Sequence, residues 1–156
     1  NAQQTALYFA DGTQMHDFRT LQVHEAPRTR SDLLFKGAVK DTAKSVYTGL
    51  IKISENATKT EAFQTNRNLT LSHGAWAESV PNLEIETNDV KCSHASTVGP
   101  IDDEQRFYLE SRGVPPEIAE RLVVFGFFDE VIEQLPKSEF IEGIRAKVIA
   151  KLGSNA

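Results

Sequence analysis

Short runs of alternating apolar and polar residues fill the first two thirds of the chain. The clearest runs are Tyr47–Ile53 and Asn82–Thr87, in which apolar residues recur largely at every second position. This period of two is typical of β-strands with one buried face. The pattern predicts a mainly β region over residues 1–99.

The strand-like runs recur at a nearly constant interval. Ile53–Ala57 aligns with Leu71–Ala75, and Ala43–Tyr47 aligns with Lys59–Phe63. A repeat of about 17 residues, holding two or three short strands, cannot bury its apolar face alone and must stack on its neighbours. The interval therefore predicts a β-solenoid in which each repeat forms one rung.

Stacked rungs would place equivalent residues in one column. Phe35, Ile53 and Leu71 are each separated by one such interval and are predicted to form an apolar ladder that faces inward. The alternative is an antiparallel sandwich with strands at a similar spacing. Asn-Gly and Gly-Gly turns, which are typical of antiparallel hairpins, are scarce, and their scarcity favours the solenoid.

The last third of the chain has helical patterns instead. Asp102 and Gln105 have the spacing of a capping box, and Gly113 fits the position that follows a helix end. Pro116 suits the first turn of a second helix, whose apolar positions continue until Pro136.

A third helix is predicted from its N-cap at Ser138 to Gly153. Three helices in about 50 residues bury little surface by themselves, so we expect them to pack on the solenoid or on another protein. The sequence thus divides into a β-solenoid core over residues 1–99 and a helical domain over residues 100–156. Because no helix precedes the first strand-like run, we expect the core to be truncated at its N-terminal end.

Composition and charge exclude several classes of protein. The chain has 22 acidic and 17 basic side chains, a net charge of −5, and no run of five like charges, so neither nucleic acid nor an anionic membrane is an expected partner. No apolar run approaches the roughly 18–20 residues of a membrane span. Cys92 is the only cysteine, which excludes an intrachain disulfide and fits a reducing compartment. We expect a soluble, cytoplasmic protein.

Cys92 and His94 are the first candidates for chemistry. In a strand, residues two apart point to the same face, so a thiolate and an imidazole could bind one soft or borderline metal, or His94 could tune the thiolate. Two ligands fall short of the four in a closed zinc site, which favours a metal site shared with another subunit. The alternative is a buried thiol beside a surface imidazole.

Other polar residues have weaker claims to a function. Asn66–Asn68 is interpreted as a turn or an asparagine stack. Glu84 and Glu86 share one strand face, as the carboxylates of a glycosidase could, although such acids on a sheet are usually solvated. A β-solenoid enzyme acting on acidic polysaccharides is therefore kept as the alternative function. Three further histidines are interpreted as ordinary surface or rung residues: His16, His24 and His73.

Four sequence blocks occur in an informative order: Ser31–Gly37, Gln64–Leu69, Asp89–Gly99 and Phe107–Gly113. Together with Leu122–Phe128, these blocks resemble the SufB/SufD family of iron–sulfur cluster assembly proteins. The SufD branch is favoured, because SufB-type sequences typically carry a His-Glu pair where Ala95 follows His94 here.

The resemblance implies a right-handed parallel β-helix followed by a small C-terminal α-helical domain. It also implies a scaffold without catalysis of its own, which pairs with a SufB-like paralogue through the β-helix and docks a SufC-like ABC ATPase through the helical domain. Family members have earlier rungs and an N-terminal region that this chain lacks.

The resemblance further implies roles for particular residues. Cys92 and His94 fall on positions associated with cluster assembly at the subunit interface, as a metal site shared with the partner. We expect no cofactor stably bound by the isolated fragment, a nascent iron–sulfur cluster in the complex, and a homodimer as one state of the fragment alone. Four apolar residues of the second helix are the candidates for ATPase docking: Leu122, Phe125, Phe127 and Phe128.

Overall fold

The computed structural model describes residues 1–135 and 140–153. Within them, strands fill the chain up to Gly99 and helices begin at Asp103. The elements are β1 (Ala2–Ala10), β2 (Met15–His24), β3 (Arg30–Val39), β4 (Lys44–Ile53), β5 (Thr60–Thr70), β6 (Trp76–Ile85), β7 (Val90–Gly99), α1 (Asp103–Ser111), α2 (Pro116–Ile132) and α3 (Phe140–Gly153). No helix in this part of the chain combines the length and the apolar character that crossing a membrane takes.

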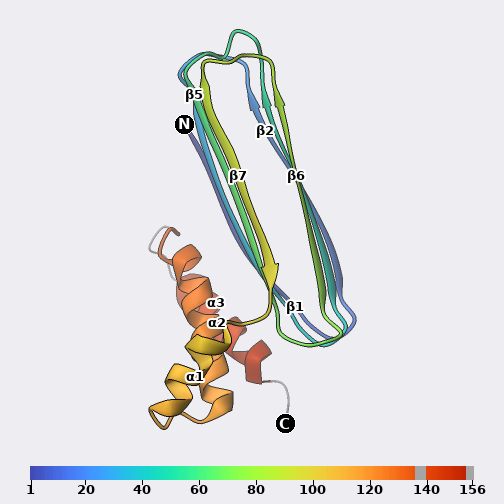
Figure 1. Ribbon diagram of the computed structural model, residues 1–156, viewed down its shortest axis with the longest axis vertical. Helices are drawn as coiled ribbons and strands as arrows, with labels where there is room; N and C mark the ends of the chain where they lie inside the picture. Colours follow the sequence, from blue (N-terminus) through green and yellow to red (C-terminus); the bar gives the residue numbers. More distant parts are fainter. Residues whose placement is uncertain (136–139, 154–156) are drawn as a thin grey trace.

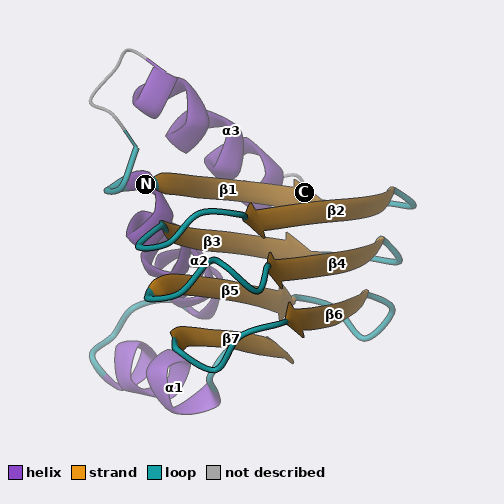
Figure 2. Cartoon of the chain, turned by 90° about the horizontal axis from the view of Figure 1, so that it is seen from above, coloured by secondary structure: helices purple, strands orange, loops and turns teal. Residues whose placement is uncertain are grey.

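The strands form two sheets that face each other, and every strand pair is parallel (Figures 1 and 2). One sheet has the order β1-β3-β5-β7 and the other has the order β2-β4-β6. Because consecutive strands alternate between the sheets, the chain winds as a parallel β-solenoid followed by helices. The predicted fold class is confirmed, and the antiparallel alternative is wrong.

The predicted length of a rung is wrong. Ala2 lies beside Ser31 in the register of β1 and β3, and Lys44 lies beside Trp76 in that of β4 and β6. One rung of the stack therefore takes about 30 residues. The interval seen in the sequence corresponds to roughly half a rung, which is one strand and its turn.

The predicted ladder fails for the same reason. A step of half a rung carries the chain from one sheet to the other, so Phe35 lies in β3 whereas Ile53 lies in β4. Leu71 follows β5 and packs with the helices outside the solenoid. The residues that flank Phe35 in register are Ala6 and Asn66.

Two local predictions agree with the structure only in part. The run Asn82–Thr87 belongs only in part to a strand, because β6 ends at Ile85. Asn66–Asn68 lies within β5 rather than in a turn. The two asparagines face the interior, where Asn68 donates a hydrogen bond to Asn66 at 2.8 Å.

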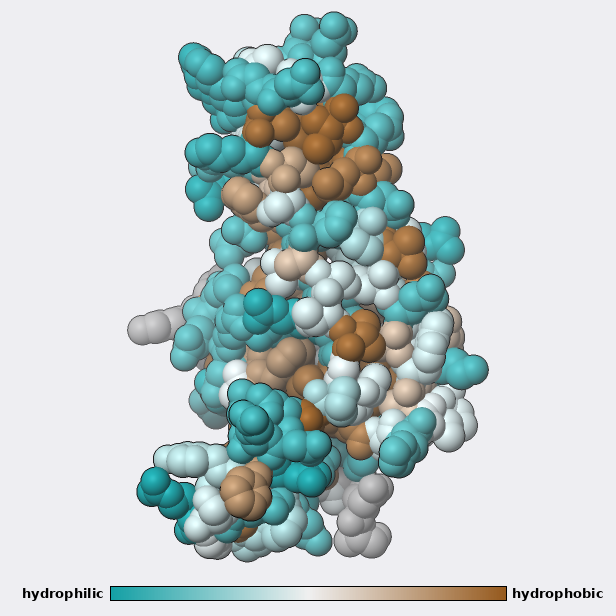
Figure 3. Space-filling view, viewed as in Figure 1, coloured by the Kyte–Doolittle hydropathy of each residue, from teal (hydrophilic) through white to brown (hydrophobic). Residues whose placement is uncertain are grey.

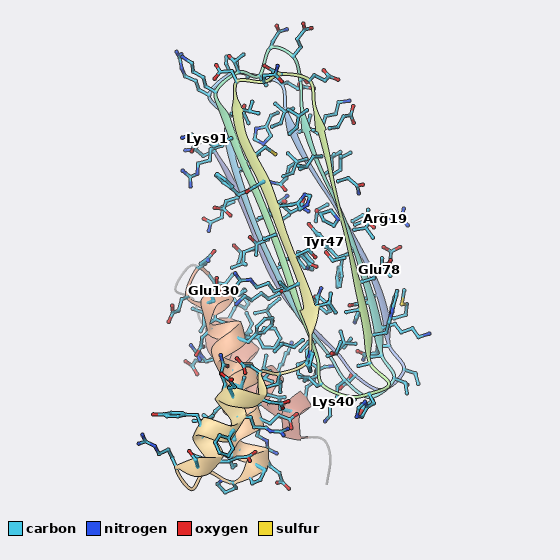
Figure 4. The ribbon with its side chains drawn as sticks, viewed as in Figure 1. Arg19, Lys40, Tyr47, Glu78, Lys91 and Glu130 are labelled. Carbon is cyan, nitrogen blue, oxygen red and sulfur yellow. The ribbon has the colours of Figure 1, made fainter. Side chains whose placement is uncertain are left out.

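Large and small residues interlock between the sheets. Tyr8 packs on Phe18 with ring centroids 4.7 Å apart, and Phe35 packs on Tyr47 at 5.1 Å, well within the range of favourable aromatic contact. Gly37 leaves the space that the Tyr8 ring fills, because a Cβ at Gly37 would lie 2.1 Å from Tyr8 Cζ. The Tyr8 hydroxyl then donates to Asn68 Oδ1 at 2.7 Å. Figure 4 shows Tyr47 between the two sheets.

The helix boundaries follow their local signals. The Asp102 side chain caps α1 by accepting from the backbone N–H of Glu104 at 2.9 Å, and Gly113 adopts a positive φ of 86° after the helix end. α2 begins at Pro116 as predicted. The predicted stop at Pro136 and the predicted N-cap at Ser138 lie outside the described residues.

α2 covers the outer face of the four-stranded sheet. Phe128 and Val124 pack with Phe9 of β1 and Ala38 of β3 in one buried cluster. Beside it, Lys36 of β3 is only 2% exposed, donates to the Phe127 carbonyl at 2.8 Å, and forms an ion pair with Glu130. Figure 4 shows Glu130 on α2, on the side of this sheet. The helices therefore bury β1 and β3 from outside the solenoid.

Candidate functional site

The solenoid ends in an open rung. β7 pairs only with β5, and β6 pairs only with β4, so no further rung of the described residues closes this end of the stack. Figure 3 looks onto this face. Side chains that would be enclosed one rung earlier are accessible here.

Cys92 and His94 both belong to this open rung. In the register of β5 and β7, Cys92 lies beside Ala62 and His94 lies beside Gln64. Ala62 and Gln64 are buried residues of the inner face, so Cys92 and His94 also lie on that face. The structure therefore places the two candidates on one side of β7, at the end of the stack.

Their surroundings differ. Cys92 is half-buried and packs against a cluster that contains Ile51, Ile53 and Ala62. His94 is exposed and makes no side-chain hydrogen bond to the described residues. The thiol thus sits in the apolar part of the rung and the imidazole in its accessible part.

Burial raises the pKa of the Cys92 thiol above its ordinary value. Desolvation disfavours the thiolate, and no neighbouring positive charge contributes to the shift. The free site therefore holds a neutral thiol, which would lose its proton when a metal ion binds to it.

An apolar patch surrounds Cys92. We call Leu83, Ile85, Val90 and Cys92 the last-rung patch; in register they lie beside inward-facing residues of β4 and β5, and so on the inner sides of β6 and β7. Figure 3 shows apolar surface on this face at the end of the strands far from the helices. Leu83 is 40% exposed and Ile85 39%. A partner that covers the patch would remove water from the thiol.

The number of metal-ligating groups is small. Among residues 1–135 and 140–153, no three His, Cys, Asp or Glu side chains come together in a way that could hold a metal ion. Cys92 and His94 can supply two ligands, and a metal or cluster bound there would need the remaining ligands from elsewhere.

Glu84 and Glu86 are both exposed, as expected of solvated acids on a sheet. Glu84 forms an ion pair with Lys52 at 2.6 Å on the outside of the solenoid, and Glu86 lies beyond the end of β6. His24, by contrast, is a buried rung residue bonded to Thr29 and Ser31, and burial lowers its pKa.

The four candidates for ATPase docking have different environments. Phe128 is fully buried against the solenoid, and Phe125 and Phe127 pack against the same cluster. Leu122 is 48% exposed. The accessible part of the predicted docking surface is therefore at Leu122, beside a cavity of about 650 Å³ that α1, α2 and β5 enclose in part.

The sequence predicted no role for two buried polar residues, Lys36 on the outer face of the four-stranded sheet and Gln64 on its inner face. Lys36 is a buried cation, and its signal in the sequence is a single lysine inside the apolar run Leu33–Val39. Gln64 lies beside His94 in the register. Its position could be found only after the length of the rung was known.

Comparisons with known proteins agree with this architecture. The family model described as SUF system FeS cluster assembly, SufBD core domain, matches residues 1–127. An iron–sulfur cluster assembly SufBD family protein of Mycobacterium tuberculosis is 46% identical over 95% of this chain and 39% of its own length.

Two relatives are named iron–sulfur cluster assembly protein SufD. The Escherichia coli protein is 40% identical over 88% of this chain and 31% of its own length, and the Bacillus subtilis protein is 39% identical over 89% and 31%. The chain that forms this parallel solenoid, with its open rung and its helices on one face, thus falls in a known class of cluster assembly proteins. This chain is a member of the SufBD family, and it resembles SufD as predicted; it spans about two fifths or less of the length of these relatives.

Proposed function

We propose that this chain is part of a SufD-like scaffold subunit, at which a nascent iron–sulfur cluster is assembled together with a SufB-like paralogue and a SufC-like ABC ATPase. The observation that carries the proposal is the position of Cys92 and His94 on the inner face of the open last rung. The cluster is cargo in this scheme, and the subunit has no catalytic activity of its own.

The last-rung patch supports the interface with the paralogue. Leu83 and Ile85 expose apolar surface around Cys92, and the edges of β6 and β7 carry unpaired backbone groups. A second solenoid could cover the patch and pair with these edges. Covering the rung would also bring the partner's ligands to the two that Cys92 and His94 supply.

The chemistry of the two side chains suits this cargo. Thiolate sulfur and imidazole nitrogen are both ligands of iron in iron–sulfur proteins. Because burial raises the pKa of the Cys92 thiol, ligation must release a proton, so the free subunit binds metal weakly and the complex binds it better.

The helices are the proposed docking element for the ATPase. Leu122 and the neighbouring cavity present apolar surface between α1 and α2, on the side of the chain away from the last-rung patch. Separate surfaces let one subunit hold both partners. The lone cysteine fits the reducing cytoplasm, in which we place the complex.

The test uses the full-length protein in complex with its SufB-like and SufC-like partners. Cys92→Ser and His94→Ala should each slow cluster formation at least tenfold, followed by visible absorption, while both variants keep the thermal midpoint of the wild type. Ser93→Ala, which changes an outward-facing residue between the two, is the matched control. Wild-type rates for both variants would refute the assembly role.

The partners are tested by separate losses of binding. Leu83→Glu should weaken binding of the SufB-like paralogue, and Leu122→Glu should weaken binding of the ATPase, each with the other interaction retained. If Leu83→Glu instead breaks only a dimer of identical subunits, the last-rung patch is a homodimer interface and the proposed pairing is wrong.

A further inference from the structure

Gln64 keeps a polar group buried without a partner. It lies on the inner face of β5, is 2% exposed, and its Oε1 has no hydrogen-bond partner among the described residues. An unpaired buried amide oxygen costs about 1–3 kcal/mol, whereas a methionine of similar shape would avoid that cost. The amide oxygen therefore has a hydrogen-bonding capacity that this part of the chain leaves unused.

The interior is shaped around this amide. Gly49 lies opposite in β4, and a Cβ there would approach Gln64 Nε2 to 2.3 Å and Oε1 to 2.6 Å. Any larger residue at position 49 would displace the amide. The missing side chain at Gly49 thus leaves room for the Gln64 amide between the two sheets.

His94 is the residue beside Gln64 in the open rung. Neighbouring strands lie about 4.8 Å apart, and both side chains are on the inner face, so His94 lies next to Gln64 in the stack. In the free chain no hydrogen bond joins them, and the Gln64 oxygen stays unpaired. A neutral histidine that binds metal through one ring nitrogen carries a proton on the other, and that N–H needs an acceptor once water is excluded. Gln64 has the acceptor and lacks the donor.

We propose that Gln64 is a positioning residue for His94: its side-chain oxygen accepts the N–H of one ring nitrogen and thereby directs the other nitrogen toward the open end of the rung. This inference rests on the proposed role of His94 in cluster assembly. A partner that covers the rung strengthens the hydrogen bond, because it removes the water that competes for the imidazole.

Ser79 provides a matched control. Its Oγ is also buried without a partner among the described residues, and it faces the interior from β6 in the opposite sheet. A hydroxyl on the far side of the rung is the competing acceptor for the imidazole N–H. The two residues can be separated by changing each alone.

The experiment uses the full-length protein with its SufB-like and SufC-like partners, and compares Gln64→Met, Gln64→Glu and Ser79→Ala. Gln64→Met should slow cluster formation about tenfold, because lost outer hydrogen bonds typically weaken metal ligation by a factor of about 10–100. Gln64→Glu keeps an acceptor oxygen and should have a higher rate than Gln64→Met, although its buried carboxyl should lower the thermal midpoint. Ser79→Ala should equal the wild type. The thermal midpoint of Gln64→Met should be equal to or above that of the wild type, whereas a merely structural glutamine would lower it.

A second measurement reads the hydrogen bond directly. The ¹⁵N shifts of the His94 ring, recorded in the complex with a neutral imidazole, should show one tautomer in the wild type and a mixture in Gln64→Met. A wild-type rate and an unchanged tautomer in Gln64→Met, with His94→Ala impaired, would overturn this inference and leave the proposed function standing. A loss confined to Ser79→Ala would also overturn it. A wild-type rate for His94→Ala alone would likewise overturn this inference, whereas wild-type rates for both His94→Ala and Cys92→Ser would refute the proposed function.

Discussion

β5 and β7 are neighbours in one sheet, yet they differ sharply in burial. The five inner residues of β5, from Thr60 to Asn68, are all buried, whereas the residues beside them in β7 are half-buried or exposed. Both strands have the same alternation of faces, so the difference comes from the presence or absence of a further rung. In a solenoid, the end of the stack decides which inner side chains can meet a partner.

The other sheet shows the same contrast. Ile53 of β4 is fully buried, and Ile85, which lies beside it in β6, is 39% exposed. Apolar residues at the open rung thus continue the interior column without being enclosed. The site and the last-rung patch are the interior of the solenoid made accessible.

The largest expected effect tests this contrast with one substitution at two rungs. Ile53→Asp should lower the free energy of unfolding by about 4 kcal/mol or more, because it places an unpaired carboxylate in a dry interior. Ile85→Asp, in the same column, should cost no more than about 1 kcal/mol. Urea unfolding measures both; equal losses would show that the last rung is as enclosed as the one before it.

A second pair of substitutions compares a glycine in an enclosed rung with a glycine in the open last rung. Gly37→Ala should destabilise the protein by about 1–3 kcal/mol, because its Cβ would collide with the Tyr8 ring. Gly99→Ala, at the end of β7, meets no atom within 4 Å and should be nearly neutral. Calorimetric unfolding distinguishes them, and Gly37→Ala with Tyr8→Leu should recover part of the loss. A neutral Gly37→Ala would contradict the interlocking of Gly37 with Tyr8.

These columns also explain which parts of the fold could be predicted from the sequence. Alternation and helix caps are local signals, so the solenoid class, the Asp102 cap and the start of α2 were predictable. The true rung was not, because residues in one column differ in size: Tyr8 is followed by Gly37 and then by Asn68. Because large residues interlock with small ones, equivalent positions in successive rungs hold different residue types. A search for repeats depends on similar residues at those positions and therefore misses the true rung.

The site was predictable only in part. The spacing of Cys92 and His94 already implies a shared strand face. Their place at the open end depends on where the stack stops, and the neighbours Gln64 and Ala62 depend on the register between β5 and β7, which are a full rung apart in the chain. Likewise, the partner of Lys36 is Glu130, which lies far along the chain in α2. No local pattern reports such contacts.

A third and smaller contrast lies on the outer face, where α2 covers β1 and β3 but leaves β7 uncovered. The contact between α2 and β3 includes the ion pair of Glu130 with Lys36. The ion pair with Lys36 lowers the pKa of the Glu130 carboxyl below its ordinary value of 4.5, chiefly through the hydrogen bond from Lys36. Glu130→Gln should therefore cost about 1 kcal/mol at pH 7. Since the folded-state pKa is the lower one, the stabilisation is present above the ordinary pKa and is lost as the pH falls through the folded value.

The control for this ion pair is a double-mutant cycle. In a Lys36→Met background, the cost of Glu130→Gln should shrink to the smaller part that the ion pair with Arg67 at 3.5 Å contributes. Urea unfolding between pH 3 and pH 7, a range of about four units around the carboxyl pKa, measures both costs. An equal cost of Glu130→Gln with and without Lys36 would show that the pair does not fasten α2 to β3.

The smallest effect concerns the Cys92 thiol, which is half-enclosed by the rung below it. Because burial raises its pKa, Cys92 should react with iodoacetamide more slowly than glutathione at neutral pH, and its rate should keep rising at alkaline pH. The same shift means that the unfolded thiol ionises first, so the protein should lose a little stability, under about 1 kcal/mol, as the pH rises past the ordinary thiol pKa. Unfolding in urea should restore the ordinary alkylation rate, and binding of the SufB-like partner should suppress alkylation further. A folded chain that reacts as fast as glutathione would place Cys92 in open solvent, and protection unchanged by the partner would mean that the partner does not cover the last rung.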